Sequence, residues 1–136
     1  MKTDLIKITN EIEARNDATR CLINEALRTG DLDKIDTVTT PINIQQKRIA
    51  DFERSWSSYV APQYSMDHSA DEQNARQEMP DQLRLIRDTA REIESLITAI
   101  LEGSSEFEQF MNSAYTIANS QADYIRELRD LIGDLS

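Results

Sequence analysis

Apolar residues recur at steps of three and four along most of the chain, which is the spacing of one face of an α-helix. The most regular run alternates steps of four and three, as in helices that pack in coiled-coil fashion. Its members are Met79, Leu83, Ile86, Ala90, Ile93, Ile97 and Ile100. No run alternates apolar and polar residues with a period of two. The pattern therefore predicts an all-α protein.

Breaks in the pattern divide the first half of the chain into two helical segments. Gly30 can adopt the left-handed conformation that ends a helix, and Asp31 can cap the next one. Pro41 lacks an amide donor, so we expect it to interrupt the second segment. These features predict a helical hairpin over about 4–60, followed by a connecting loop without helical period over about 61–70.

Two serines mark the starts of the later helices. Ser69 precedes Glu72 and Ser105 precedes Glu108 at the spacing of a capping box, in which each side chain bonds the other residue's amide. The two boxes predict two further helical segments. These segments cover about residues 71–102 and 105–132.

Two residues govern how the third segment joins its neighbours. Pro80 is expected to kink or begin this helix. Gly103 separates it from the last segment, although the heptad register continues through the glycine and one long bent helix is the alternative. Residues 1–136 are thus predicted to form a single domain, an antiparallel bundle of three to four long helices with coiled-coil-like seams.

The last segment carries two overlapping apolar seams, which cover more of its circumference than one neighbouring helix requires. An apolar face of this width can accept an amphipathic helix from a partner protein. The residues predicted to bind such a partner are Phe107, Phe110, Met111, Ala114, Ile117, Ala118 and Ile125.

The charge balance narrows the choice of partners. The chain has 25 acids and 15 bases, a net charge of −10, and all four lysines lie in its first half. This acidity argues against binding to nucleic acid and to anionic lipid. No apolar run approaches the roughly 18 residues of a membrane span, and no signal-peptide core follows the N-terminus. One cysteine, Cys21, fits a reducing compartment, so we expect a soluble cytoplasmic protein.

Residue types that carry catalysis are sparse. The chain has no Glu-x-x-His motif for a di-iron centre and no closely spaced glycines for a phosphate loop. His68 lies in the aperiodic connection, whereas a phosphotransfer histidine belongs on a helix face. Cys21 is expected to be a small, half-buried apolar residue. We therefore expect no catalytic residues, no cofactor and no metal site.

Three stretches carry a combination of features: Glu25–Ile35, Gln45–Ile49 and Asn112–Ile132, the last with Asn119 and Leu128–Ile132. They place a Gly-Asp-Leu turn after a long first helix, followed by a helix that carries lysine. In these residues the chain resembles the FlgN-type flagellar export chaperones, and its last segment is similar in character to the last helix of that family.

The resemblance implies a cytoplasmic chaperone that holds the helical C-terminal segment of hook–filament junction proteins and delivers them to the type III export gate. It further implies that a tyrosine of the last helix contacts an export-gate protein. Tyr115 lies off the first seam and is the preferred candidate, whereas Tyr124 lies on that seam and is expected to pack. The alternative is a helical adaptor or structural coiled-coil protein that self-associates, as a homodimer for example, through the seam of the third segment.

Overall fold

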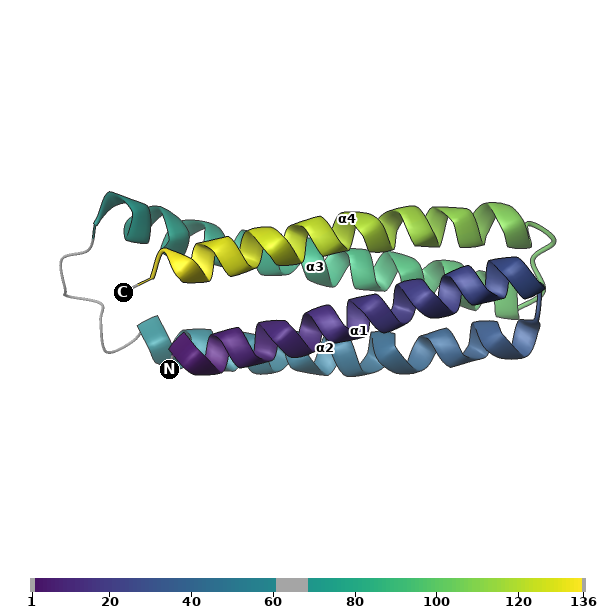
Figure 1. The fold of residues 1–136 in the computed structure, drawn as a ribbon, viewed down its shortest axis with the longest axis horizontal. Helices are drawn as coiled ribbons and strands as arrows, with labels where there is room; N and C mark the ends of the chain where they lie inside the picture. Colours follow the sequence, from purple (N-terminus) through teal and green to yellow (C-terminus); the bar gives the residue numbers. More distant parts are fainter. Residues whose placement is uncertain (1, 61–68, 136) are drawn as a thin grey trace.

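The computed structural model describes residues 2–60 and 69–135, and within these ranges it contains four helices and no strand. They are α1 (Lys2–Thr29), α2 (Leu32–Val60), α3 (Ala70–Leu101) and α4 (Phe107–Gly133). The helices alternate in direction, so that α1 and α3 run antiparallel to α2 and α4 (Figure 1). Both α1 and α3 pack against α2 and against α4. The predicted all-α antiparallel bundle is confirmed.

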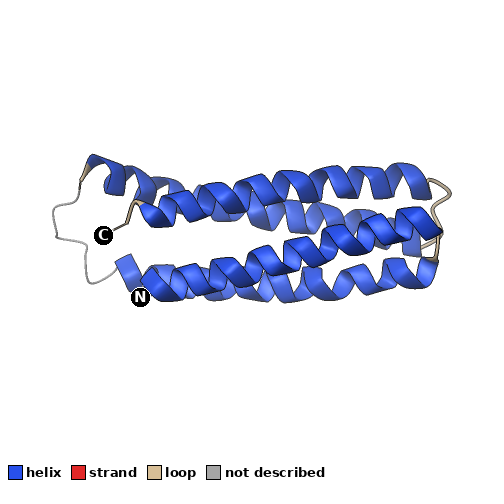
Figure 2. Cartoon of the chain, viewed as in Figure 1, coloured by secondary structure: helices blue, strands red, loops and turns tan. Residues whose placement is uncertain are grey.

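Both short turns lie at one end of the bundle and contain a glycine with positive φ (Figure 2). Gly30 has φ of 68°, and its N–H donates to the Ala26 carbonyl at 2.7 Å. Gly103 has φ of 101°, and its N–H donates to the Ile100 carbonyl at 3.1 Å. Glycine adopts this conformation without the steric cost of a Cβ. The chain therefore turns at Gly103 and does not form one long bent helix from α3 into α4.

Of the two predicted capping boxes, the first one caps its helix. The Glu72 N–H donates to Ser69 Oγ at 3.1 Å, and α3 begins at Ala70, the residue after Ser69. The prediction for Ser105 was wrong, because the residue that precedes α4 is Glu106, whose side chain makes no capping hydrogen bond. Ser104 Oγ instead accepts from the Glu106 N–H at 3.2 Å, so the turn after Gly103 is longer than the box allows.

The predicted interruption at Pro41 was wrong, since α2 continues through it, and α3 begins well before Pro80. A proline inside a helix removes one hydrogen bond and costs roughly 3 kcal/mol. Continuing α2 buries Val38 and Ile42 on either side of Pro41, each at most 1% exposed. Each such burial contributes about 1.5–3 kcal/mol, so packing outweighs the lost bond.

The buried apolar side chains form two clusters, stacked along the bundle axis. The turn-end cluster lies beside the glycine turns and contains Ile23, Ala26, Ile35, Val38, Ile42, Ala90, Ile93, Ile97, Ile100, Met111, Ala114 and Ala118. The far-end cluster contains Leu5, Ile12, Ile49, Phe52, Trp56, Tyr59, Ala75, Met79, Leu83, Ile86, Ile125, Leu128, Leu131, Ile132 and Leu135. Both include residues from all four helices, and together they bury the whole regular seam of α3 within the chain.

Four buried polar side chains, one from each helix, separate the two clusters. Along its own helix, each lies between the last residue of one cluster and the first of the other. We call this set the polar layer; it consists of Asn16 on α1, Gln45 on α2, Thr89 on α3 and Gln121 on α4. Each of the four is at most 8% exposed. Burial of polar groups at this depth costs stability unless they are hydrogen-bonded. The side chains of the layer bond one another through most of their polar atoms, whereas Asn16 Oδ1 has no hydrogen-bond partner among the described residues.

Gln121 is the centre of the polar layer. Its Oε1 accepts from Asn16 Nδ2 at 2.9 Å and from Gln45 Nε2 at 2.8 Å. Its Nε2 donates to Thr89 Oγ1 and to the Ile86 carbonyl, both at 3.0 Å. One amide side chain thus links all four helices at a single level. Hydrogen bonds of an amide group are directional. The four bonds of Gln121 therefore fix the axial register of the helices relative to one another.

Candidate protein-binding face

Four of the residues predicted to bind a partner are inside the bundle. Met111, Ala114, Ala118 and Ile125 are 0% exposed and belong to the two core clusters. The double seam of α4 has a structural explanation, because this helix packs against both α1 and α3 and must bury a wide arc. In the closed bundle a partner has no access to these four side chains.

The other three predicted binding residues, Phe107, Phe110 and Ile117, are half-buried and lie over the turn-end cluster. Phe110, Ile117 and Tyr124 follow one another at seven-residue steps, so they share one flank of α4. That flank faces α3, because Gln82 Nε2 on α3 donates to the Tyr124 carbonyl at 2.8 Å. These side chains therefore lie on the surface along the line where α3 and α4 pack together.

Helix α3 contributes two leucines to the same surface. Leu96 lies seven residues after Thr89, whose hydroxyl meets Gln121 of α4, and it is half-buried. Leu85 lies one turn after Gln82 and is 40% exposed. Both leucines thus face the α4 side of their helix. We call the surface they form the α3–α4 face; it consists of Leu85, Leu96, Phe110, Ile117 and Tyr124.

Sequence reasoning missed Leu85 and Leu96. The signal was present, since both are large apolar residues between the positions of the regular seam, where a solvent-facing helix carries polar residues. Leu85 in particular follows Arg84 directly and lies two residues before Arg87, within a charged stretch of the sequence. A patch of partly exposed apolar side chains, such as the α3–α4 face, is a feature of protein-binding surfaces.

The two candidate tyrosines lie on opposite flanks of α4. Tyr115 is half-buried against the turn-end cluster, and its hydroxyl accepts from Asn24 Nδ2 on α1 at 3.4 Å. Tyr124 is half-buried against the far-end cluster on the α3 side. The ring of Tyr115 thus lies at the edge of the core on the α1 side of α4, on the other flank from Tyr124.

The Glu25–Ile35 stretch, which carries part of the family resemblance, forms the α1–α2 turn. Lys34 Nζ donates to Glu25 Oε1 at 2.6 Å across this turn. The hydrogen bond and the positive charge of Lys34 lower the pKa of the Glu25 carboxyl. The ion pair joins the end of α1 to the first turn of α2, beside Gly30. Both side chains are partly exposed, so the pair adds little to stability while it connects the two sides of the turn.

The remaining chemical candidates are reported for the described part of the chain. Cys21 is exposed on α1, so the prediction of a half-buried thiol was wrong. His68 lies outside the described residues. Within residues 2–60 and 69–135, no three histidine, cysteine or acidic side chains group as a metal site would require. None of the helices in these ranges is both long and apolar enough to cross a membrane.

Comparison with known proteins adds no relative: no protein-family model, no curated protein and no solved structure matches this chain. The features that bear on function are therefore the α3–α4 face and the residues that carry the resemblance.

Proposed function

We propose that this bundle is a cytoplasmic type III export chaperone of the FlgN type, which binds the helical C-terminal segment of hook–filament junction proteins. The observation that carries the proposal is the α3–α4 face. The bundle buries two apolar clusters, and five further large apolar side chains stay partly accessible along the line where α3 and α4 pack. The resemblance of the Glu25–Ile35 and Asn112–Ile132 stretches to that family supplies the identity of the cargo.

The dimensions of the face suit a helical cargo. Phe110 and Tyr124 are separated by two heptads, which corresponds to about 21 Å along α4 at 1.5 Å per residue. A cargo helix of about four turns can pack its apolar side against the α3–α4 face. Bound in this way, its own apolar side is covered and cannot assemble with other junction proteins before export.

The positions of the tyrosines suggest how binding and delivery are combined. Tyr124 belongs to the cargo face, whereas Tyr115 lies on the α1 side of α4. An export-gate protein can therefore contact Tyr115 while the cargo occupies the other flank of α4. On this proposal Tyr124→Ala weakens cargo binding, and Tyr115→Ala leaves cargo binding intact but lowers export of the cargo in a motile host.

The direct test is binding of the purified chain to the hook–filament junction proteins of its own genome, measured by isothermal titration calorimetry. Leu85→Glu places a charge on the proposed face and should weaken binding at least tenfold, because the carboxylate must be desolvated. The matched control is Ile6→Glu on α1, since Ile6 is 39% exposed and Leu85 is 40% exposed. The control should bind within a factor of two of the unmodified chain.

The possible results separate the function from the face. If the unmodified chain binds no junction protein, the chaperone proposal fails. If it binds and both glutamate variants bind equally well, the function stands but the cargo lies elsewhere. The alternative, a self-associating adaptor, was expected to use the regular seam of α3. That seam is buried within one chain and is not available to a second copy. Sedimentation of the free chain as a dimer or larger assembly would favour that alternative through another surface.

A further inference from the structure

Charge is distributed unequally between the two helical hairpins. Residues 1–60 contain ten acids and nine bases, whereas residues 61–136 contain fifteen acids and six bases. Nearly the whole excess of negative charge is therefore in the second half of the chain. The α1–α2 hairpin is close to neutral overall, and its bases are not evenly spread.

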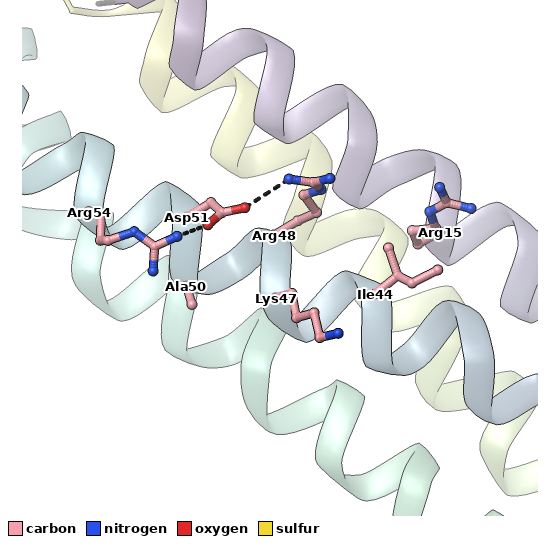
Figure 3. A pocket seen from close by; sticks show the side chains of 7 residues that line it. All are labelled: Arg15, Ile44, Lys47, Arg48, Ala50, Asp51 and Arg54. Atoms are coloured by element: carbon pink, nitrogen blue, oxygen red, sulfur yellow. Dashed lines mark hydrogen bonds and ion pairs between the residues drawn. The ribbon is translucent and has the colours of Figure 1, made fainter.

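Several of these bases gather in a surface pocket between α1 and α2 (Figure 3). Arg15 comes from α1, and the other lining residues come from less than four turns of α2. We call this pocket the basic groove; it is lined by Arg15, Ile44, Lys47, Arg48, Ala50, Asp51 and Arg54. Four of the seven residues are cations and one is an acid.

The acids at the groove pair with only two of its four cations. Asp51 is shared, because Arg48 Nη1 donates to its Oδ2 at 2.9 Å and Arg54 pairs with its Oδ1. Arg48 Nε also contacts Glu11 at 3.0 Å. Arg15 and Lys47 have no ion pair with any described residue. Two exposed cations thus face an open groove without a counter-charge from the bundle itself.

We propose that the basic groove binds a short acidic segment of a partner protein. Arginine and lysine bind carboxylates by charge-assisted hydrogen bonds, and Arg15 and Lys47 have donors available for them. Ile44 and Ala50 offer apolar surface beside the cations for the aliphatic part of a bound side chain. From Ile44 to Arg54 the groove extends about 15 Å along α2, which matches four to five residues of extended chain.

The charge pattern favours such a segment over a longer polyanion. A nucleic-acid duplex or an anionic membrane would extend past the groove and meet the acids of the α3–α4 hairpin, where repulsion opposes binding. A short acidic peptide interacts with the groove alone. The basic groove belongs to α1 and α2 and the α3–α4 face to the other hairpin, so this inference does not depend on the proposed cargo site.

The test uses a fluorescein-labelled hexapeptide, Glu-Leu-Glu-Glu-Leu-Glu, and fluorescence anisotropy at low ionic strength, where surface charges are least screened. The double variant Arg15→Ala with Lys47→Ala should bind at least fivefold more weakly than the unmodified chain. The matched control, Arg84→Ala with Arg126→Ala, also removes two exposed arginine or lysine charges but from α3 and α4. It should change the affinity less than twofold.

A charge-preserving variant, Arg15→Lys with Lys47→Arg, should retain binding within threefold, and circular dichroism should give the same helix content for every variant. The proposal is overturned if the unmodified chain shows no saturable binding, or if both alanine pairs weaken binding equally, which would indicate net charge alone. It is also overturned if a short DNA duplex or phosphatidylserine vesicles bind more tightly than the peptide and lose that binding in the Arg15/Lys47 variant.

Discussion

Replacing Gln121 with leucine tests whether the polar layer stabilises the bundle as a connected set. The side chain of Gln121 makes four buried hydrogen bonds, which connect α4 to each of the other helices. Leucine has a similar volume, so Gln121→Leu removes these bonds without opening a large cavity. The substitution leaves the polar partners from the other helices in the core.

The magnitude follows from what those partners retain. Asn16 Nδ2 still donates to the Ala118 carbonyl, and Gln45 Nε2 still donates to the Ile12 carbonyl. Thr89 still donates within its own helix. No partner is therefore fully orphaned, and four bonds at roughly 0.5–1 kcal/mol each give a loss of about 2–4 kcal/mol in the free energy of unfolding.

A fully apolar layer should behave differently. In the quadruple variant Asn16→Leu, Gln45→Leu, Thr89→Val and Gln121→Leu, no unpaired polar group stays behind, and such replacements are often neutral or stabilising. We expect this variant to be more stable than Gln121→Leu alone. The cost would appear in specificity, as less cooperative unfolding or as more than one helix register in the NMR spectrum.

Urea denaturation measures both effects, followed by circular dichroism and by the fluorescence of Trp56, the only tryptophan. Gln46→Leu is the control, because Gln46 is half-buried and its side chain donates one hydrogen bond, to Glu94 Oε2 at 3.2 Å. It should cost less than about 1 kcal/mol. The reasoning is refuted if Gln121→Leu is as stable as the control variant, or if the quadruple variant is less stable than the single one.

Three further predictions concern the helices and their turns. Gly103→Ala should lower the free energy of unfolding by about 1–2 kcal/mol because of the positive φ of Gly103. Gly133→Ala at the end of α4 should raise that free energy by about 0.4–1 kcal/mol. Neither added Cβ meets an atom within 4 Å, so a difference between the two variants in thermal melts reports backbone strain and not steric overlap. Pro80→Ala should stabilise the chain by roughly 1–3 kcal/mol in urea titrations, because Pro80 is exposed inside α3 and its packing contributes little. Equal or lower stability would show that the proline is accommodated without cost. Finally, Lys34→Met should raise the pKa of Glu25 towards the ordinary glutamate value in an NMR titration, and an unchanged value would exclude the ion pair in solution. Because Lys34 lowers that pKa, the stabilisation from the pair is present above the ordinary glutamate pKa and is lost as the pH falls through the lowered one.

Local signals predicted the helices and the turn at Gly30, because these depend on neighbouring residues, and they left the turn at Gly103 as one of two alternatives. Gly30 follows an apolar run, and Ser69 has the spacing to Glu72 that caps a helix. The prolines misled because their cost is local and small, while the burial that outweighs it comes from other helices. The spacing of apolar residues around Pro41 does not show that the other helices bury Val38 and Ile42 almost completely.

The candidate site was harder to predict for a different reason. Periodicity measures how wide an apolar arc is, but not how many helices cover it. For α4, two neighbours fill the arc, so Met111 and Ile125 are core residues and the accessible part shifts to the α3 flank. The polar layer did leave a trace, because Gln45 and Gln121 occupy positions within the apolar seams. A polar residue at such a position suggests a buried partner without identifying which one.

The placement of the two core clusters has a consequence for the order in which the chain folds. The turn-end cluster includes residues close in sequence, such as Ala26 and Ile35 on either side of one glycine turn and Ile100 and Met111 on either side of the other. The far-end cluster includes Leu5 together with residues of α4 more than a hundred positions away. Closing a short loop costs less chain entropy than closing a long one. We therefore expect each hairpin to form first beside its glycine and the ends of the chain to become ordered last.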